Sequence, residues 1–182
     1  MKHTALLIAG LSALLLGAAR SAPLELDTTR SRIQVDAKAT GHAFGGTLKK
    51  FTASVAGNSD SLAPAAFTLS WKFKDLDTDN DKRDAQMLKW LGGDPAQGSF
   101  KFTKAWTDAK GVSHAQGKLT INQVSKTISF PYTATKEGDW VTIHGEASLD
   151  YQNFELPIIR SMAVMTVDPK LTVRFHVVGK IK

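Results

Sequence analysis

The chain has 182 residues, with 23 Lys and Arg against 17 Asp and Glu, a formal net charge of +6 and no cysteine. This length fits one domain with a substantial core, and the missing thiols exclude disulfides and thiolate chemistry. The basic residues are few in excess and scattered, which disfavours nucleic-acid binding but could suit anionic membrane surfaces or acidic ligands.

The N-terminal segment predicts export. Lys2 is followed by an uncharged, leucine-rich run over 5–19 and by small residues around Arg20, which is the order of regions in a signal peptide. The run of about 15 residues is shorter than the roughly 20 that a membrane-spanning helix needs. We expect residues 1–22 to be a signal peptide, cut between Ala19 and Ala22, and residues 23–182 to form one periplasmic or secreted domain. Losing Lys2 and Arg20, with no acid in that segment, lowers the net charge from +6 to +4.

Alternating apolar and polar residues predict strands along the rest of the chain. In residues 32–38, Ile33, Val35 and Ala37 face one side and their polar neighbours face the other, the pattern of a half-buried strand. The same alternation has apolar positions at Phe67, Leu69, Trp71, Phe73, Phe100, Phe102, Leu119, Ile121, Ile128, Phe130, Tyr132, Val141, Ile143, Ala147, Leu149, Tyr151, Leu171, Val173, Phe175 and Val177. Turn signals lie at Gly45-Gly46, Gly57-Asn58, 108–111, 136–139 and Asp168-Pro169. Seven or eight such strands predict an all-β sandwich or barrel.

One segment, 81–91, breaks the alternation and predicts a short helix. Asp81 is the expected N-cap, and Gly92-Gly93 ends the segment. Met87, Leu88 and Leu91 form an apolar stripe that we interpret as packing rather than as a binding feature.

Three parts of the sequence resemble the YceI-like family. The predicted helix and its lead-in, 80–91 (NDKRDAQMLKWL), resemble the family's helix after the third strand. Residues 95–102 and 117–128 are similar to its "P…F.F" strand entry and its "G.LTI.G" hairpin, and 26–35 to its first strand. Asn122-Gln123 replaces the usual His-Gly and 42–46 is a local variant, differences that bear on the ligand more than on the fold.

The resemblance implies an all-β fold, an extended eight-stranded antiparallel lipocalin-like barrel with one short inserted α-helix. It also implies that the interior holds a long apolar molecule, with polyisoprenoids and isoprenoid quinones as the ligand class. Eight strands leave an interior that is either filled by side chains or open to one small ligand, and the sequence leaves both possibilities open.

We predict that eight inward-facing side chains line the cavity and contact the ligand. They are Phe67, Leu69, Trp71, Phe73, Phe100, Phe102, Phe130 and Tyr132. The alternative is that they only fill the core, as aromatic residues do in any barrel. Candidates to bind a polar head group are Asp84, Arg83, His42, Trp71, Tyr151 and Arg160.

Neither metal binding nor catalysis is predicted, and no cofactor is expected. His42, His114, His144 and His176 show no i, i+4 pair, although His144 and His176 could meet across strands. The acids of 75–81 resemble a calcium loop but lack its glycine and closing glutamate. No catalytic motif is present.

A long connection over 157–165 precedes the last strand. If exposed, its apolar residues would suit transient membrane or partner contact, but we expect it to cover one barrel opening. The leading hypothesis is a binding or carrier protein for an isoprenoid-type or other long-chain lipid, without covalent chemistry. The alternatives are a structural or stress-related interaction module with a filled barrel and, third, an enzyme acting on a lipid. Monomer and homodimer both stay open.

Overall fold

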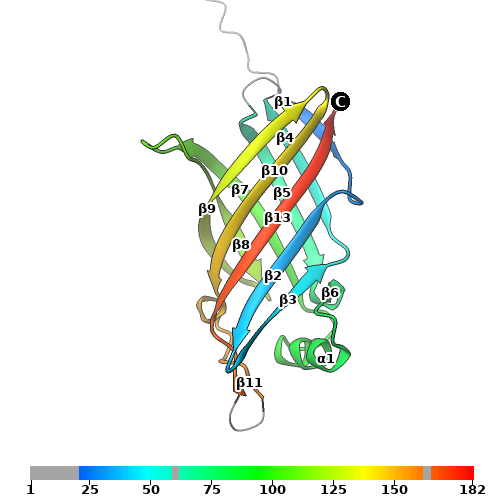
Figure 1. Cartoon of the computed structure of the whole chain (residues 1–182), viewed down its shortest axis with the longest axis vertical. Coiled ribbons are helices and arrows are strands. Elements are labelled where there is room, and N and C mark those ends of the chain that lie inside the picture. The colour runs from blue at the N-terminus through cyan, green and yellow to red at the C-terminus, as the bar shows by residue number, and fades with distance from the viewer. Residues whose placement is uncertain (1–20, 59–61, 162–164) are drawn as a thin grey trace, which may run out of the picture.

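The protein is a closed antiparallel β-barrel with one helix at one end. The computed structural model describes residues 21–58, 62–161 and 165–182, so most of the predicted signal peptide lies outside the described residues. Eight strands close the ring in the order β1, β4, β5, β7, β8, β9, β10 and β13, because β13 pairs with β1 as well as with β10. Figure 1 shows the barrel along its length, with α1 and β11 at one end and the C-terminus at the other. The predicted fold class is confirmed.

The element bounds follow the alternation closely. The helical elements are η1 (Phe73–Asp75), α1 (Asp81–Trp90) and η2 (Tyr151–Phe154). The strands are β1 (Ser21–Leu26), β2 (Arg32–Ala39), β3 (His42–Leu48), β4 (Thr52–Asn58), β5 (Pro64–Lys72), β6 (Leu76–Asp77), β7 (Gln97–Thr107), β8 (Ser113–Ile121), β9 (Val124–Glu137), β10 (Trp140–Asp150), β11 (Arg160–Ser161), β12 (Met165–Thr166) and β13 (Lys170–Ile181). With 14 residues, β9 spans about 46 Å at roughly 3.3 Å per residue, so the barrel is long for its circumference.

A corner between β1 and β2 lets both strands pair with the same edge of β13. Leu24–Leu26 pair with its last residues and 32–36 with its first half. At the corner, the Asp27 carboxylate accepts hydrogen bonds from the backbone N–H groups of Thr29 and Arg30, at 3.0 and 3.1 Å. The Ser31 hydroxyl accepts a hydrogen bond from the Val178 N–H at 3.0 Å, so the corner is joined to β13.

Four local expectations from the sequence are wrong. Tyr151 does not continue β10 but begins η2. Gly45-Gly46 is not a turn but lies inside β3, opposite Asp36 and Val35. The turn falls at Gly41, whose φ is +83°. Phe73 does not continue β5 but begins η1. The helix cap is Asn80 rather than Asp81: its side chain accepts a hydrogen bond from the Arg83 N–H at 3.0 Å, because Asn80 has the extended backbone that an N-cap requires.

Close packing against β6 and the residue after it explains the glycine at position 46 in β3. A methyl group on Gly46 would lie 3.1 Å from Thr78 and 3.2 Å from Leu76. Glycine therefore allows β6 and the residue after it to approach the sheet closely. The structure needs glycine at position 46 for close approach, not for chain reversal.

Nine of the buried apolar side chains form two clusters around the α1 end of the barrel. One contains Leu91, Ala96, Phe100, Leu119, Ile121 and Phe154, and the other contains Ile33, Leu48 and Leu76. Met87 of α1 packs against both clusters, which fixes the helix at this end of the barrel. The described part of the 157–165 connection lies at the same end: the Trp90 Nε1 donates a hydrogen bond to the Pro157 carbonyl at 3.0 Å.

Candidate functional site

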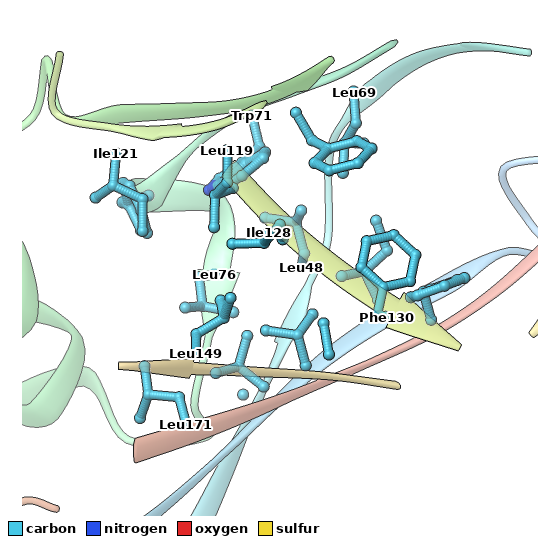
Figure 2. A pocket seen from close by; sticks show the side chains of 18 of the residues that line it. Leu48, Leu69, Trp71, Leu76, Leu119, Ile121, Ile128, Phe130, Leu149 and Leu171 are labelled. Atoms are coloured by element: carbon cyan, nitrogen blue, oxygen red, sulfur yellow. The ribbon is translucent and has the colours of Figure 1, made fainter. Parts of the chain in front are cut away.

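The interior of the barrel is an apolar cavity of about 580 Å³. This lies within the range of roughly 300–1,000 Å³ that is usual for small-molecule sites. Its wall takes side chains from every strand of the closed ring and from α1. Figure 2 shows leucine, isoleucine and aromatic side chains from facing strands converging on the space, among them Leu69, Ile128, Phe130 and Leu149.

All eight side chains predicted from the sequence lie on the cavity wall. They come from β5, η1, β7 and β9, and include Phe73 in spite of its helical backbone. Their contact with a ligand stays a prediction. The apolar side chains of β2, β10 and β13 were predicted to alternate along strands, but they were not predicted as site residues. The wall residues missed in this way include Ile33, Val35, Ile143, Ala147, Leu149, Leu171, Val173, Phe175 and Val177.

Four phenylalanine rings form an aromatic row across the wall. The row is Phe67, Phe100, Phe130 and Phe175, with successive ring centroids 5.8, 5.6 and 5.3 Å apart. These separations are typical of favourable aromatic pairs. The rings come from β5, β7, β9 and β13, so the row crosses two strands, β8 and β10, that contribute no ring to it.

Glycines on neighbouring strands make room for these rings. A methyl group on Gly117 in β8 would overlap the Phe100 ring, and one on Gly145 in β10 would overlap the Phe175 ring. Trp71 lies in the same way over Gly98, its register partner in β7. An isolated glycine inside a strand signals such a close approach, and this signal was available in the sequence.

Most polar groups of the wall lie at the α1 end, although Asn58 of β4 and Tyr132 of β9 line the wall elsewhere. Lys82 and Arg83 line the cavity from the first half of the helix, and Gln86, Met87 and Trp90 line it from the second half. The spacing 82, 86, 90 with 83, 87 is one face of a helix. His42, Thr78 and Asn80 lie beside them on the wall.

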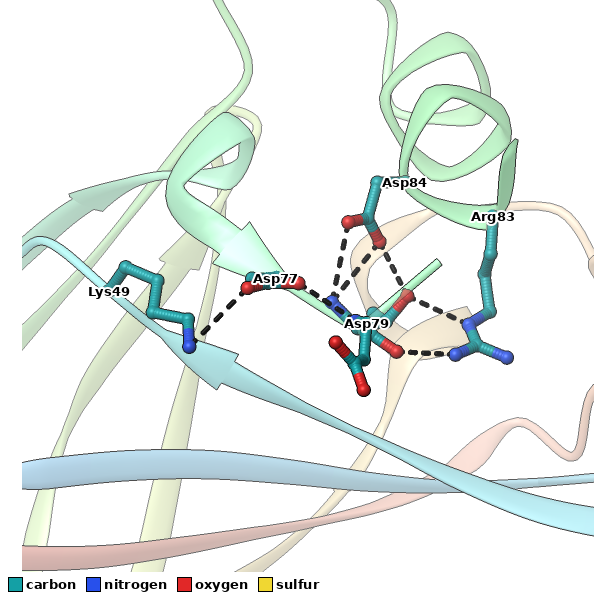
Figure 3. Close-up of polar contacts among 6 residues, drawn as sticks. Lys49, Asp77, Asp79, Arg83 and Asp84 are labelled. Carbon is teal, nitrogen blue, oxygen red and sulfur yellow. Dashed lines mark hydrogen bonds and ion pairs between the residues drawn. The ribbon is translucent and has the colours of Figure 1, made fainter. Parts of the chain in front are cut away.

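Thr78 connects the segment after β6 to α1 through hydrogen bonds. It is the one buried polar residue of the described chain, at 7% exposure. Its hydroxyl donates to the Asp84 carboxylate at 2.5 Å and accepts from the Arg83 Nε at 2.8 Å, while its carbonyl oxygen accepts from Nη2 of Arg83. Figure 3 shows Asp84 and Arg83 reaching from α1 to these atoms. The Arg83 guanidinium also stacks on Phe44 at 4.5 Å, so the network orients Arg83 on the wall.

The YceI-like domain model matches residues 24–179, nearly the whole barrel. The chain belongs to the YceI-like family.

Solved structures with this YceI-like fold are distant in sequence. BcnA of Burkholderia cenocepacia aligns over 85% of this chain and 99% of its own, with 20% identity and a TM-score of 0.71. A polyisoprenoid binding domain from Saccharophagus degradans, implicated in plant cell wall breakdown, aligns over 90% and 100% with 10% identity and a TM-score of 0.63. The YceI protein of Campylobacter jejuni aligns over 86% and 85%, with 15% identity and a TM-score of 0.50. Among curated proteins, none matches the chain. At these identities the likeness establishes the fold alone.

The six head-group candidates of this YceI-like barrel divide into two sets. Arg83, His42, Trp71 and Tyr151 lie on the cavity wall. Asp84 does not, since its carboxylate is turned to Thr78, and Arg160 is exposed on β11 away from the wall.

Tyr151 joins the connection after β10 to the end of the YceI-like barrel. The side chain is 2% exposed, and its hydroxyl donates to the Val167 carbonyl at 2.9 Å and accepts from the Ile159 N–H at 3.2 Å. Burial raises the pKa of Tyr151, so the phenol stays protonated at neutral pH and can make both bonds. Ile159 and Val167 both line the cavity, while covering of the opening by the whole connection stays a prediction.

Replacing Tyr151 by phenylalanine removes both hydrogen bonds and is expected to destabilise the YceI-like barrel by about 1–3 kcal/mol, because the two backbone groups lose their partner. Urea unfolding followed by far-UV circular dichroism measures the change. Tyr132→Phe serves as the control, since Tyr132 also lies on the wall but has a single side-chain partner, Ser113. Equal stabilities for the two variants would contradict this role for Tyr151.

His144 and His176 meet on the outside of the YceI-like barrel, as the sequence allowed. They are register partners in β10 and β13, and their Nδ1 atoms lie 3.1 Å apart. Burial and then His144 lower the pKa of His176, so this ring is neutral at pH 7. Among the residues that the structure describes, no group of three or more His, Asp or Glu side chains could hold a metal ion. Likewise, no helix within the described ranges is long and apolar enough to cross a membrane.

Proposed function

We propose that this YceI-like protein is an exported carrier that holds one long-chain apolar ligand, a polyisoprenoid, an isoprenoid quinone or a related lipid, inside its barrel. The observation that carries the proposal is the apolar cavity of about 580 Å³, walled by side chains from every strand of the ring. Transfer of a lipid tail into such a space is favourable by about 25 cal/mol per Å² of apolar surface removed from water, before the costs of ordering and association.

The open interior favours the carrier over an interaction module. A structural or stress-related module would need only a filled barrel, and side chains in a filled core leave few voids larger than a water molecule. Here the aromatic row and the opposite strands leave a continuous space. The polyisoprenoid-binding domain with the same fold adds support for the ligand class.

Export rests on the N-terminal sequence. Lys2, the leucine-rich run over 5–19 and the small residues that follow supply the pattern, and a periplasmic carrier would move lipid through water without spanning the membrane. Cell fractionation followed by mass analysis of the N-terminus tests this part. Recovery of the chain in the cytosol with residues 1–22 intact would refute it.

Native mass spectrometry of protein purified from the periplasm tests the carrier function. We expect a bound species of one per chain, released by organic extraction and identified by its mass as an isoprenoid or fatty-chain lipid. In a second arm, the extracted and refolded protein is incubated with a ubiquinone and measured again. Protein that is empty when purified and takes up no quinone would refute the proposal and leave the interaction module as the better description.

A further inference from the structure

The charge on the cavity wall is of one sign and at one end. Among the described residues that line the cavity, the permanently charged side chains are Lys82 and Arg83, and none is Asp or Glu. Both cations are in the first turn of α1, where the polar wall residues gather. The opposite end is lined mainly by apolar residues such as Leu24, Pro64 and Ile181. A ligand that fills the space therefore meets an apolar environment along its length and positive charge at one end.

Lys82 has no partner in the part of the chain that the structure describes. Its ammonium group forms no hydrogen bond or ion pair there, although ion pairs occur elsewhere, as between Lys49 and Asp77 at 3.3 Å. The amide of Gln86, one turn along the same helix face, also has no hydrogen bond to a described residue. Donors on a cavity wall without protein partners are available to a ligand.

Arg83 is held in place but keeps donors free. Its Nε and Nη2 bond to Thr78 and its plane covers Phe44. None of these contacts uses Nη1, so Arg83, which lines the cavity, keeps a donor group that is not bonded to Thr78. A fixed guanidinium binds carboxylate and phosphate well because its geometry matches theirs.

Acids near the helix do not cancel this charge at the wall. The Asp84 carboxylate is bonded to the hydroxyl and N–H of Thr78, and the Asp77 carboxylate to Lys49 and the Asp79 N–H. Asp79 and Asp81 are exposed. None of the four lies on the cavity wall, whereas Lys82 and Arg83 do.

We propose that the α1 end of the cavity binds an anionic head group, a phosphate or a carboxylate, of a single-chain lipid whose tail occupies the barrel. Lys82 and the free edge of Arg83 contact the anion, and Gln86 donates a further hydrogen bond. This inference rests on the proposed carrier function and adds the chemistry and orientation of its ligand. The exposed side chain of Lys82 keeps the head partly hydrated, which suits a charge that would be costly to bury fully.

Three ligands with one tail test the proposal by calorimetry: farnesyl monophosphate, farnesoic acid and farnesol. Wild-type protein is expected to bind at least one of the two anions about tenfold more tightly than the alcohol. This ratio is the contribution to affinity expected from one or two charge-assisted hydrogen bonds. The preferred anion identifies the head group. Lys82→Glu should remove the preference, because it weakens binding of the preferred anion about tenfold and binding of farnesol by much less. High salt should weaken binding of the anion more than binding of farnesol, because Lys82 is exposed and its charge is screened.

Lys89→Glu is the matched control. Lys89 is an exposed lysine of the same helix, so Lys89→Glu makes the same change in net charge as Lys82→Glu. Unlike Lys82, it is not on the cavity wall. It should alter all three affinities less than twofold. Equal binding of farnesol and both anions by the wild type, or equal losses in the two variants, would overturn the head-group inference while the carrier function stands. Failure of all three ligands to bind would overturn the carrier function and this inference together.

Discussion

Gly117→Ala is expected to destabilise the barrel by about 1–3 kcal/mol, as overpacking of a well-packed interior does. The added methyl group would overlap the Phe100 ring and lie 2.6 Å from the Lys101 carbonyl oxygen. Phe100 is buried between its neighbours in the aromatic row, and the Lys101 oxygen is backbone, so neither can move without disturbing others. Urea unfolding monitored by circular dichroism measures the loss.

Two further alanine variants separate overlap from a general effect of alanine in a strand. The three atoms nearest to a methyl group on Gly145 all belong to the Phe175 ring, which is half-buried at the end of the aromatic row, so the cost of Gly145→Ala should be smaller than that of Gly117→Ala. Gly45→Ala, also in a strand, would meet Asp36 Oδ1 at 3.3 Å and should change the free energy of unfolding by less than about 1 kcal/mol. If all three variants are equally stable, glycine is not required to seat the rings.

Ala147→Trp is expected to abolish lipid binding while the protein stays folded. Ala147 is 6% exposed, lies in β10 and faces the cavity. A tryptophan there occupies the space that the tail needs, and because the space is open the indole adds buried apolar surface instead of overpacking the wall. We expect at least tenfold weaker binding of a ubiquinone, measured by quenching of intrinsic fluorescence and checked by native mass spectrometry.

The neighbouring residue gives the control for this substitution. Ser148 follows Ala147 in β10 and is exposed, so Ser148→Trp places the same ring on the outer face. Binding by this variant should equal that of the wild type. Leu149→Trp, on the cavity wall two residues further along, gives a second blocked variant in case Ala147→Trp fails to fold. Normal binding by a folded blocked variant would show that the ligand does not use the cavity.

The barrel was predictable from the sequence because its strands have one apolar and one polar face. Alternation in 32–38 and around Phe67 and Phe100 reports local geometry, and β2, β5 and β7 follow it. The helix was also predictable, since Gly92-Gly93 ends it with φ values of +96° and +103°.

Features that depend on distant residues were not predictable from local pattern. Gly45-Gly46 resembles a turn, but its role is set by Thr78 and Leu76, which approach it from another part of the chain. Thr78 itself was overlooked, because a threonine between aspartates gives no sign of being buried between Arg83 and Asp84.

The sequence allowed us to predict which side chains face the interior of the barrel, but not whether they leave an open cavity. Seven of the eight chosen residues lie on the wall because inward-facing positions of a strand are fixed by its period of two, and Phe73 reaches the wall from η1. Whether these side chains meet in the centre depends on the circumference of the ring and on all inward residues together. Phe175 was missed because the chosen residues came only from β5, η1, β7 and β9, although the aromatic row ends on Phe175 beside Phe130.

The lining of the cavity has a consequence for the volume of the molecule. An apolar wall gives water few hydrogen-bonding partners, so the interior of the ligand-free protein holds space that is poorly hydrated. Unfolding eliminates such space, and the system shrinks by an amount that scales with it. Hydrostatic pressure should therefore unfold the ligand-free barrel more readily than the loaded one, and the lipid would act as the missing part of the core.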